Sequence, residues 1–354
     1  MRKLAVAVIG GDGIGPEVIS AARRVLEAAG RRHDLGFAFE EFGWGAEYYF
    51  QHGRMMPPQA IEVLGRFDAI LLGAVGHPDI PDHVTLNGLL LPIRRGLDLY
   101  ANVRPAVLYP GVESPLAGRK PGDIDLVVVR ENTEGEYAQA GGFLYQQQPH
   151  EVAVQTSVFT RRGIERVVRF AFDLAVRRDK TRRVTSITKS NAQGYSMVLW
   201  DRVFAAVAQE YPSIETESLL VDAAAMDFVR RPQHFDVVVA SNLFGDILSD
   251  LSAIVTGSIG LAPSGNLDPS RRHPSLFEPV HGSAQDIAGR GIANPMAAML
   301  SAAMMLEHLD CLPAARAVEA AVTSVLAEAQ VRTPDLGGDS STQQVTEAVL
   351  ERLE

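Results

Sequence analysis

Short apolar runs, each bounded by polar residues or glycine, recur along the 354-residue chain. They lie at Leu4–Ile9, Ala69–Val75, Ile124–Val129, Val184–Thr188 and Val237–Ala240. Such runs are typical of strands that are buried on both faces, as in a parallel sheet. Segments with helical spacing separate the runs. The pattern therefore predicts an α/β fold with a largely parallel sheet.

The helical spacing is clearest in three segments. The first runs from Pro16, a residue favoured in a first helical turn, to Gly30. A second apolar stripe spans Ile164–Ala175, and a third, very apolar helix begins at Pro295. The tail from about residue 314 to residue 350 is expected to form helices that are interrupted at Thr333–Gly338.

One segment departs from this alternation of buried strands and helices. Residues Glu151–Val158 alternate polar and apolar side chains, as an antiparallel strand with one apolar face does. The segment follows Gly141 and Gly142, so a hairpin is expected. A projecting hairpin that packs against a second subunit and an ordinary hairpin on the same core fit the pattern equally well.

Composition and charge narrow the class of protein. The formal net charge of −10 argues against a nucleic-acid or anionic-membrane partner, since both require a basic surface. It does not exclude a small anionic substrate. Cys311 is the single cysteine, so a reducing, cytoplasmic location is expected. No apolar stretch reaches the roughly 20 residues that a membrane span needs, and the N-terminal apolar run is interpreted as a strand, not a signal peptide.

A glycine-rich segment, Gly11-Asp12-Gly13-Ile14-Gly15-Pro16, joins the first predicted strand to the first predicted helix. Its glycine spacing differs from the Rossmann fingerprint, and it lacks the lysine and hydroxyl residue of a P-loop. A tight turn and a ligand-binding loop both remain open. Neither Glu40 nor Glu41 is assigned to a ribose.

Two acidic residues are spaced for one helix face. Asp246 and Asp250 lie four residues apart in an otherwise apolar stretch. Like charges at this spacing repel by about 0.2–0.5 kcal/mol on an exposed helix. A hard cation such as Mg²⁺ or Mn²⁺ would relieve the repulsion and prefers oxygen ligands. The alternative is a solvated helix start, with Asp246 near the positive end of the helix dipole.

Several basic residues and one tyrosine are candidates for substrate chemistry. Arg94, Arg104 and Arg130 can each bind a carboxylate in a bidentate manner, and Arg130 ends a buried strand, where α/β sheets bind ligands. Lys189 also closes a predicted strand and could act as a base, while Tyr137 could donate a proton. Each residue could instead be structural or part of a surface ion pair.

Together these motifs resemble the β-decarboxylating dehydrogenase family, which includes isopropylmalate, isocitrate, homoisocitrate and tartrate/D-malate dehydrogenases. The resemblance runs nearly end to end and is most specific at 242–250 and 278–289. It implies an α/β fold of the isopropylmalate/isocitrate dehydrogenase type, with two lobes that share one large twisted, mostly parallel sheet, and not a Rossmann fold.

The resemblance also implies how the chain is divided and assembled. Residues 1–99 and 257–354 would form the first lobe, with most of the NAD site. Residues 100–256 would form the second lobe, with the dimer interface, an arm and the metal-binding acids. The protein would be a homodimer in which both subunits contribute to each active site and the 141–158 region is an interlocking arm.

Carried over position by position, the resemblance implies roles for the candidate residues. Arg94, Arg104 and Arg130 would bind the carboxylates of a small diacid substrate. Mg²⁺ or Mn²⁺ would be bound by Asp222, Asp246 and Asp250. Lys189 would be the base and Tyr137 the acid, with Lys189 and Asp222 contributed across the dimer interface. The resemblance leaves a monovalent-cation requirement open.

The resemblance implies NAD as the cofactor. Members that use NAD carry an acid where Asp286 stands, and a carboxylate there would repel the 2′-phosphate of NADP. Gln285 departs from the family's usual proline. The expected cofactor-binding residues are Ile14, Asn191, Glu278, His281, Gly282, Ser283, Ala284, Asp286, Ile287 and Asn294.

The segments 76–86, 89–95 and 130–137 resemble the tartrate/D-malate dehydrogenase subgroup. The expected reaction is therefore NAD- and metal-dependent oxidation of D-malate or tartrate, followed by decarboxylation. Isopropylmalate dehydrogenase is the alternative, because Leu90 or Leu91 could contact an isopropyl group. A catalytically inactive binding homologue is disfavoured, since each expected catalytic position carries the expected residue type.

Overall fold

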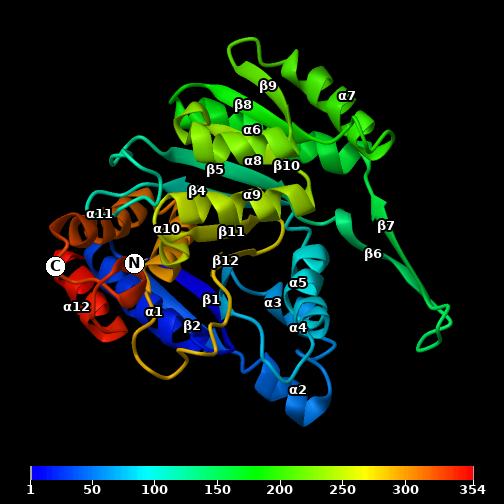
Figure 1. Ribbon diagram of the computed structural model, residues 1–354. Helices are drawn as coiled ribbons and strands as arrows, with labels where there is room; N and C mark the ends of the chain where they lie inside the picture. The colour runs from blue at the N-terminus through cyan, green and yellow to red at the C-terminus, as the bar shows by residue number, and fades with distance from the viewer. Residues whose placement is uncertain (1, 354) are drawn as a thin grey trace. The chain divides into compact units, whose positions relative to one another are not determined.

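The computed structural model describes residues 2–353 and has an α/β architecture (Figure 1). Ten strands belong to one mostly parallel sheet in the order β2-β1-β3-β12-β11-β4-β5-β10-β8-β9, and β6 and β7 form a second sheet. The fold class predicted from the sequence is confirmed.

The strands are β1 (Arg2–Gly11), β2 (Leu35–Glu41), β3 (Ala69–Ala74), β4 (Ala101–Val107), β5 (Asp125–Glu131), β6 (Gly135–Leu144), β7 (Val152–Val158), β8 (Arg183–Thr188), β9 (Glu215–Leu220), β10 (Val237–Ala240), β11 (Pro263–Leu267) and β12 (Ser275–Pro279). The α-helices are α1 (Gly15–Arg32), α2 (Ala46–His52), α3 (Ala60–Leu64), α4 (Asp82–Gly88), α5 (Leu90–Gly96), α6 (Arg161–Arg178), α7 (Ser196–Ala208), α8 (Val221–Arg230), α9 (Asn242–Val255), α10 (Met296–His308), α11 (Leu312–Glu328) and α12 (Thr342–Leu353). Three short 3₁₀ helices are η1 (Pro232–His234), η2 (Ile259–Leu261) and η3 (Pro334–Leu336).

The chain forms two compact units. Unit 1 comprises the described residues up to Leu99, Val103–Asp125 and Ser252 onward, and unit 2 comprises Tyr100–Asn102 and Leu126–Leu251. The sequence placed residues 100–256 together, whereas 103–125 and 252–256 belong to unit 1 in the structure. Their contacts explain this: Arg332 donates a hydrogen bond to the Gly111 carbonyl at 2.6 Å, and Ser114 donates one to the Val255 carbonyl at 2.6 Å.

Unit 1 buries side chains on both faces of its strands. Alternate residues of β1 point to opposite faces, so Val6 and Val8 join one apolar cluster, and Ala7 and Ile9 join another. The first cluster includes the apolar faces of α1, α10, α11 and α12, and Figure 1 shows these helices grouped together. β1 pairs in parallel with β2 and β3, and β3 pairs in parallel with β12. This explains why β1 and β3 have the continuous apolar runs seen in the sequence.

Unit 2 contains the parallel strands β5, β10, β8 and β9. Helices α6 and α7 pack together through Phe172 and Phe204, whose ring centroids lie 5.6 Å apart. The predicted hairpin is present as the antiparallel pair β6–β7, which extends away from the rest of unit 2 in Figure 1. Every residue of β7 is exposed, so its apolar face is uncovered in the single chain.

Within residues 2–353, no helix combines the length and the apolar character that a membrane span requires.

Candidate active site

Unit 2 gathers three of the predicted site residues around the buried end of β5. Arg130 is the penultimate residue of that strand and is 1% exposed. Its Nη1 forms an ion pair with Asp246, and its guanidinium carbon lies 5.3 Å from the centroid of the Tyr137 ring. Tyr137 in turn donates a hydrogen bond from its hydroxyl to Asp246 Oδ2 at 2.9 Å. Arg130, Tyr137 and Asp246 therefore form one contiguous cluster.

Helix α9 positions the acidic residues of this cluster. Asp246 and Asp250 are one turn apart on it, as their spacing predicted. The helix passes so close to β5 that a Cβ on Gly245 would lie 2.6 Å from Arg130 Cβ. Burial, followed by the Asp246 carboxylate, raises the pKa of Tyr137 to about 12. The phenol therefore keeps its proton at neutral pH and can donate it.

Lys189 and Asp222 form a second pair in unit 2. Lys189 directly follows β8, and Asp222 lies in the first turn of α8, with Lys189 Nζ 2.7 Å from Asp222 Oδ1. The hydrogen bond from Lys189 lowers the pKa of the Asp222 carboxyl, which therefore stays ionised. Across residues 2–353, no three His, Cys, Asp or Glu side chains gather closely enough to hold a metal ion. The single chain does not bring Asp222 to Asp246 and Asp250.

Unit 1 holds the other two predicted arginines. Arg94, on α5, is 3% exposed and donates from Nη2 to Glu278 Oε1 at 2.9 Å. Asn266 donates to the same carboxylate oxygen at 2.8 Å, and Arg94 Nε has no hydrogen-bond partner within the described residues. Arg104 is buried on β4. Glu278, expected at the cofactor site, is thus buried against Arg94.

The loop after β12 brings together several predicted cofactor residues. Ser283 accepts a hydrogen bond at its carbonyl from the backbone N–H of Ile14 at 2.9 Å. Gly13 has a φ of 58°, and a Cβ there would lie 1.9 Å from the Ser283 carbonyl oxygen, so the glycine turn packs directly on this loop. Ala284 and Ile287 pack on the unit 1 core, while Gly282 and Asp286 are exposed.

Two further residues of that expected set are polar and buried in unit 1. His281 is 9% exposed, its Nε2 has no hydrogen-bond partner among the described residues, and burial lowers its pKa. Asn294 donates to Asp335 Oδ2 at 3.0 Å. Asp335 belongs to the Thr333–Gly338 segment, which was predicted only as an interruption between helices. Asn191 differs from the rest, since it is exposed and lies in unit 2.

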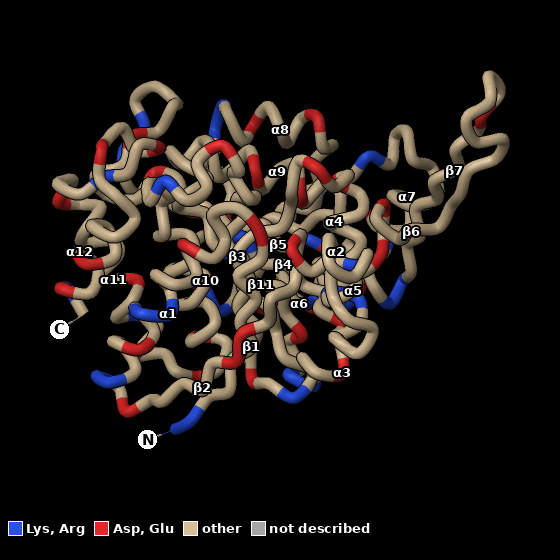
Figure 2. The backbone as a smooth tube through the Cα atoms, turned by 90° about the horizontal axis from the view of Figure 1, so that it is seen from below, with Lys and Arg blue, Asp and Glu red and all other residues tan. Residues whose placement is uncertain are grey.

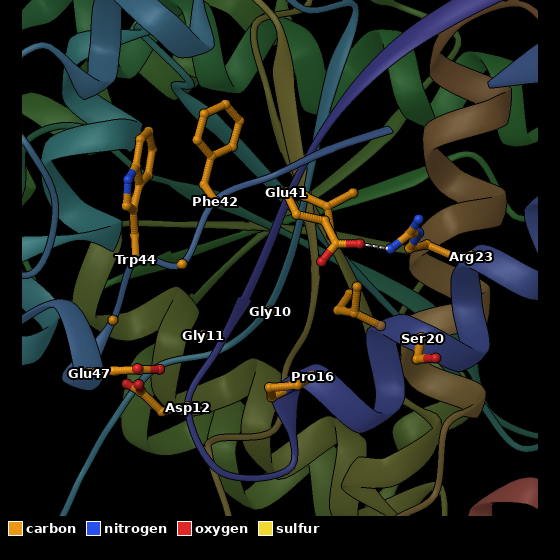
Figure 3. A pocket seen from close by; sticks show the side chains of 14 residues that line it. Gly10, Gly11, Asp12, Pro16, Ser20, Arg23, Glu41, Phe42, Trp44 and Glu47 are labelled. Carbon is orange, nitrogen blue, oxygen red and sulfur yellow. Dashed lines mark hydrogen bonds and ion pairs between the residues drawn. The ribbon is translucent and has the colours of Figure 1, made fainter. Parts of the chain in front are cut away.

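A cavity of about 390 Å³ lies next to Gly10 and Gly11. It is lined by the ends of β1 and β2 and by the start of α1 (Figure 3). Two of the lining residues, Arg23 and Glu41, form an ion pair, which the dashed line in Figure 3 marks. The oxygens of Asp12 accept hydrogen bonds from the backbone N–H groups of Ala46 at 2.7 Å and Gly76 at 2.8 Å. Asp12 therefore has a structural role, and none of the predicted cofactor residues lines this cavity.

Sequence reasoning missed one buried polar residue at the centre of the Arg130 cluster. Asn242, the first residue of α9, is 1% exposed and accepts hydrogen bonds at Oδ1 from Arg130 Nε at 2.9 Å and Nη2 at 2.7 Å. Asn242 belongs to the 242–250 motif, but no role was predicted for it. A signal was present, because an asparagine at a helix start after a fully apolar strand is positioned either to cap or to bind.

Comparison with known proteins gives a consistent set of likenesses. The isocitrate/isopropylmalate dehydrogenase family model matches residues 5–349. A probable tartrate dehydrogenase/decarboxylase of Agrobacterium vitis is 51% identical over 100% of this chain and 98% of its own. D-malate dehydrogenase (decarboxylating) of Escherichia coli strain K12 is 51% identical over 99% and 98%. A crystal structure of isocitrate dehydrogenase from Methylococcus capsulatus superposes with a TM-score of 0.88 at 38% identity, covering 100% of this chain and 99% of that one.

Proposed function

The chain belongs to the isocitrate/isopropylmalate dehydrogenase family, and on that basis we propose that it oxidises D-malate or tartrate with NAD and a divalent metal ion and then decarboxylates the product. The observation that carries the proposal is the Arg130–Asp246–Tyr137 cluster. It combines a buried cation, an acid suited to a metal ion and a phenol that keeps its proton.

The three arginines suit a substrate with two carboxylates. Arg94, Arg104 and Arg130 are all buried, and a guanidinium in a poorly hydrated setting binds a carboxylate more strongly than one in water does. Arg94 retains an Nε–H without a hydrogen-bond partner among the described residues. We assign these arginines to the carboxylates of the diacid.

The acidic residues have the donor chemistry that a hard divalent cation requires. Asp246 and Asp250 present carboxylate oxygens from one face of α9, and Asp222 would complete the set from a second subunit. When bound, a Mg²⁺ or Mn²⁺ ion polarises the 2-hydroxyl group and the adjacent carboxylate of the substrate. The chain's own task at this point is to hold these carboxylates in place.

Proton transfer is assigned to two side chains. Lys189, as the neutral amine, accepts the proton of the 2-hydroxyl group while the hydride passes from C2 to NAD. The 3-carboxy ketone that results loses CO₂, and the electron pair of the broken bond passes to C3 and the carbonyl group. Tyr137 then protonates C3, which its raised pKa permits because the phenol is still neutral at the working pH.

The loop after β12 supports NAD as the hydride acceptor. His281 offers a buried Nε2 without a protein partner in residues 2–353, and lowering of its pKa keeps the imidazole neutral. The exposed carboxylate of Asp286 can accept hydrogen bonds from ribose hydroxyls and would repel a 2′-phosphate. We therefore assign the cofactor site to this loop and the Ile14 turn.

A homodimer is part of the proposal. The β6–β7 hairpin exposes Phe143, Leu144, Val152 and Val154, and no Asp, Glu, Lys or Arg occurs from Tyr137 to His150, so this stretch is drawn in tan in Figure 2. Helices α8 and α9 expose further apolar side chains, namely Met226, Val229, Ile247 and Ile254. Apolar surface of this extent is typical of a subunit interface, and a second copy of the chain is the occupant we propose.

The alternative substrate, 3-isopropylmalate, is less well supported. Leu90, one of the two leucines that could contact an isopropyl group, is 8% exposed and packs in the apolar core of unit 1. The relatives at 51% identity carry tartrate and D-malate names.

The test is NADH formation from NAD with D-malate, meso- or L-tartrate and 3-isopropylmalate, each with Mn²⁺ or with EDTA. The proposal expects metal-dependent turnover of D-malate or tartrate and a far slower reaction with 3-isopropylmalate. Faster turnover of 3-isopropylmalate would establish the alternative.

A further inference from the structure

The guanidinium of Arg130 binds a neutral residue through two of its nitrogens. These nitrogens, Nε and Nη2, both donate to Oδ1 of Asn242, and Nη1 forms an ion pair with the Asp246 carboxylate. Both Arg130 and Asn242 are 1% exposed, so these bonds lie in a poorly hydrated setting. In such a setting the orientation of a guanidinium is set by its hydrogen-bond partners.

Asn242 is itself fixed from two sides. Its Nδ2 donates to the Glu134 carbonyl at 3.1 Å, which directs Oδ1 toward Arg130. The flanking residues are held by Glu136, whose Oε1 accepts from Ser241 Oγ at 2.7 Å and whose Oε2 accepts from the Leu243 N–H at 3.1 Å. A carboxylate that binds the Leu243 N–H in the first turn of α9 also fits the positive end of the helix dipole.

The charge of residue 242 matters as much as its shape. Asp246 is an assigned metal ligand, so a bound cation would share this carboxylate with Arg130. An amide at 242 continues to hold the guanidinium without neutralising it. A carboxylate at 242 would hold it equally well but would cancel the charge that attracts the substrate.

We propose that Asn242 is a positioning residue that keeps Arg130 oriented and positively charged toward a substrate carboxylate throughout turnover. The inference rests on the proposed function for the identity of the substrate, but not for the contact itself. Asn242 does not touch the substrate, and it acts through Arg130.

Two variants separate shape from charge. Asn242→Asp keeps an acceptor for Arg130 and adds a negative charge, so we expect KM for D-malate to rise about tenfold or more while KM for NAD stays within about twofold. Asn242→Ala removes the acceptor, so Arg130 turns, and we expect kcat to fall as well as KM to rise. The dissociation constants of D-malate with Mn²⁺ present and NAD absent, measured by calorimetry, should follow the KM values.

A matched control removes another buried hydrogen bond of unit 2. Ser186 is buried on β8 and accepts a hydrogen bond from Trp200 Nε1 at 2.9 Å. Ser186→Ala should lower thermal stability as Asn242→Ala does and leave KM for D-malate unchanged. The Mn²⁺ dissociation constant should not rise in Asn242→Asp, because the added charge attracts the cation. A rise there would overturn the proposal, since the substrate effect would then follow from lost metal.

A spectroscopic measurement tests the contact without turnover. The Arg130 Nε–H signal in a ¹⁵N NMR spectrum, assigned with Arg130→Lys, should exchange slowly with water in the wild type and in Asn242→Asp. It should broaden or vanish in Asn242→Ala. Retention of the protected signal in Asn242→Ala, with KM for D-malate unchanged, would overturn the inference. If the wild type turned over no diacid at all, the proposed function would fail, while the NMR comparison would still decide the role of Asn242.

Discussion

The Tyr137 hydroxyl donates a hydrogen bond to Asp246 Oδ2 at 2.9 Å, although 109 residues separate the two along the chain. One carboxylate thus links the assigned proton donor to Arg130, whose Nη1 binds its other oxygen. The pKa of Tyr137 is raised to about 12, first by burial and then by Asp246. The residues assigned to proton donation, substrate binding and metal binding therefore meet at the Asp246 carboxylate.

The first prediction concerns the assembly of the site. Lys189→Met and Tyr137→Phe should each lower kcat by about 10²–10⁴-fold, because each removes a proton-transfer group. If Lys189 comes from the partner subunit, a hybrid dimer of the two variants has one site with both native residues. Co-expression of two differently tagged chains should therefore restore about a quarter of the wild-type activity. If the hybrid dimer, purified through both tags, is inactive, then Lys189 and Tyr137 of the same chain belong to one site.

The second prediction concerns the approach of α9 to β5. In Gly245→Ala the new Cβ would lie 2.6 Å from Arg130 Cβ, so Arg130 or the helix must shift. We expect the free energy of unfolding to fall by about 1–3 kcal/mol and KM for D-malate to rise more than KM for NAD. Gly43→Ala is the control, since a Cβ there meets nothing within 4 Å. Equal effects of the two substitutions on KM would argue against the close approach.

The third prediction concerns the cofactor. Asp286→Ala should raise KM for NAD about tenfold or more, because a charge-assisted hydrogen bond to the ribose is lost, and it should narrow the preference for NAD over NADP. KM for D-malate should change little. Glu27→Ala, which removes an exposed acid from α1, should leave both cofactor constants as they are. An unchanged NAD-to-NADP ratio in Asp286→Ala would remove Asp286 from the cofactor site.

The fourth prediction concerns pH and Glu131, the neighbour of Arg130. Burial, opposed by hydrogen bonds from Thr133 and Glu134, raises the pKa of Glu131 from 4.5 to about 7. The folded chain then holds a proton between these pH values that the unfolded chain releases. The stability that Glu131 contributes is complete below about pH 4.5 and is lost as the pH rises through 7, by up to ~3 kcal/mol. Urea unfolding of the wild type and Glu131→Gln at pH 5, 6 and 8 measures this, and a difference that does not vary with pH would contradict it.

Strands that are apolar along their whole length could be predicted from the sequence, whereas strands that carry polar residues left little signal, at the edge of the sheet and in its middle. β3 and β10 are buried along their whole length, so each needs a continuous apolar run. β9 lies at one edge of the sheet and has no buried residue, so Glu215–Leu220 carries charged side chains and no such run. β11 pairs antiparallel with β12 through a polar Ser-Gly-Asn segment, which periodicity does not identify.

Within the site, local spacing could be predicted and long-range pairing could not. The interval between Asp246 and Asp250 already indicated one face of a helix, and α9 confirms that helix. The hydrogen bond from Arg130 to Asn242 joins residues 112 positions apart, and the hydrogen bond from Lys189 to Asp222 joins residues 33 positions apart. No spacing rule identifies such contacts, because they depend on how the strands of unit 2 are ordered.

The most direct test of the account is the stoichiometry of the reaction with D-malate, NAD and Mn²⁺. We predict one pyruvate and one CO₂ for each NADH formed, and no product of any kind when EDTA replaces Mn²⁺. NADH formation that persists in EDTA, or the absence of all three products at any metal concentration, would contradict it.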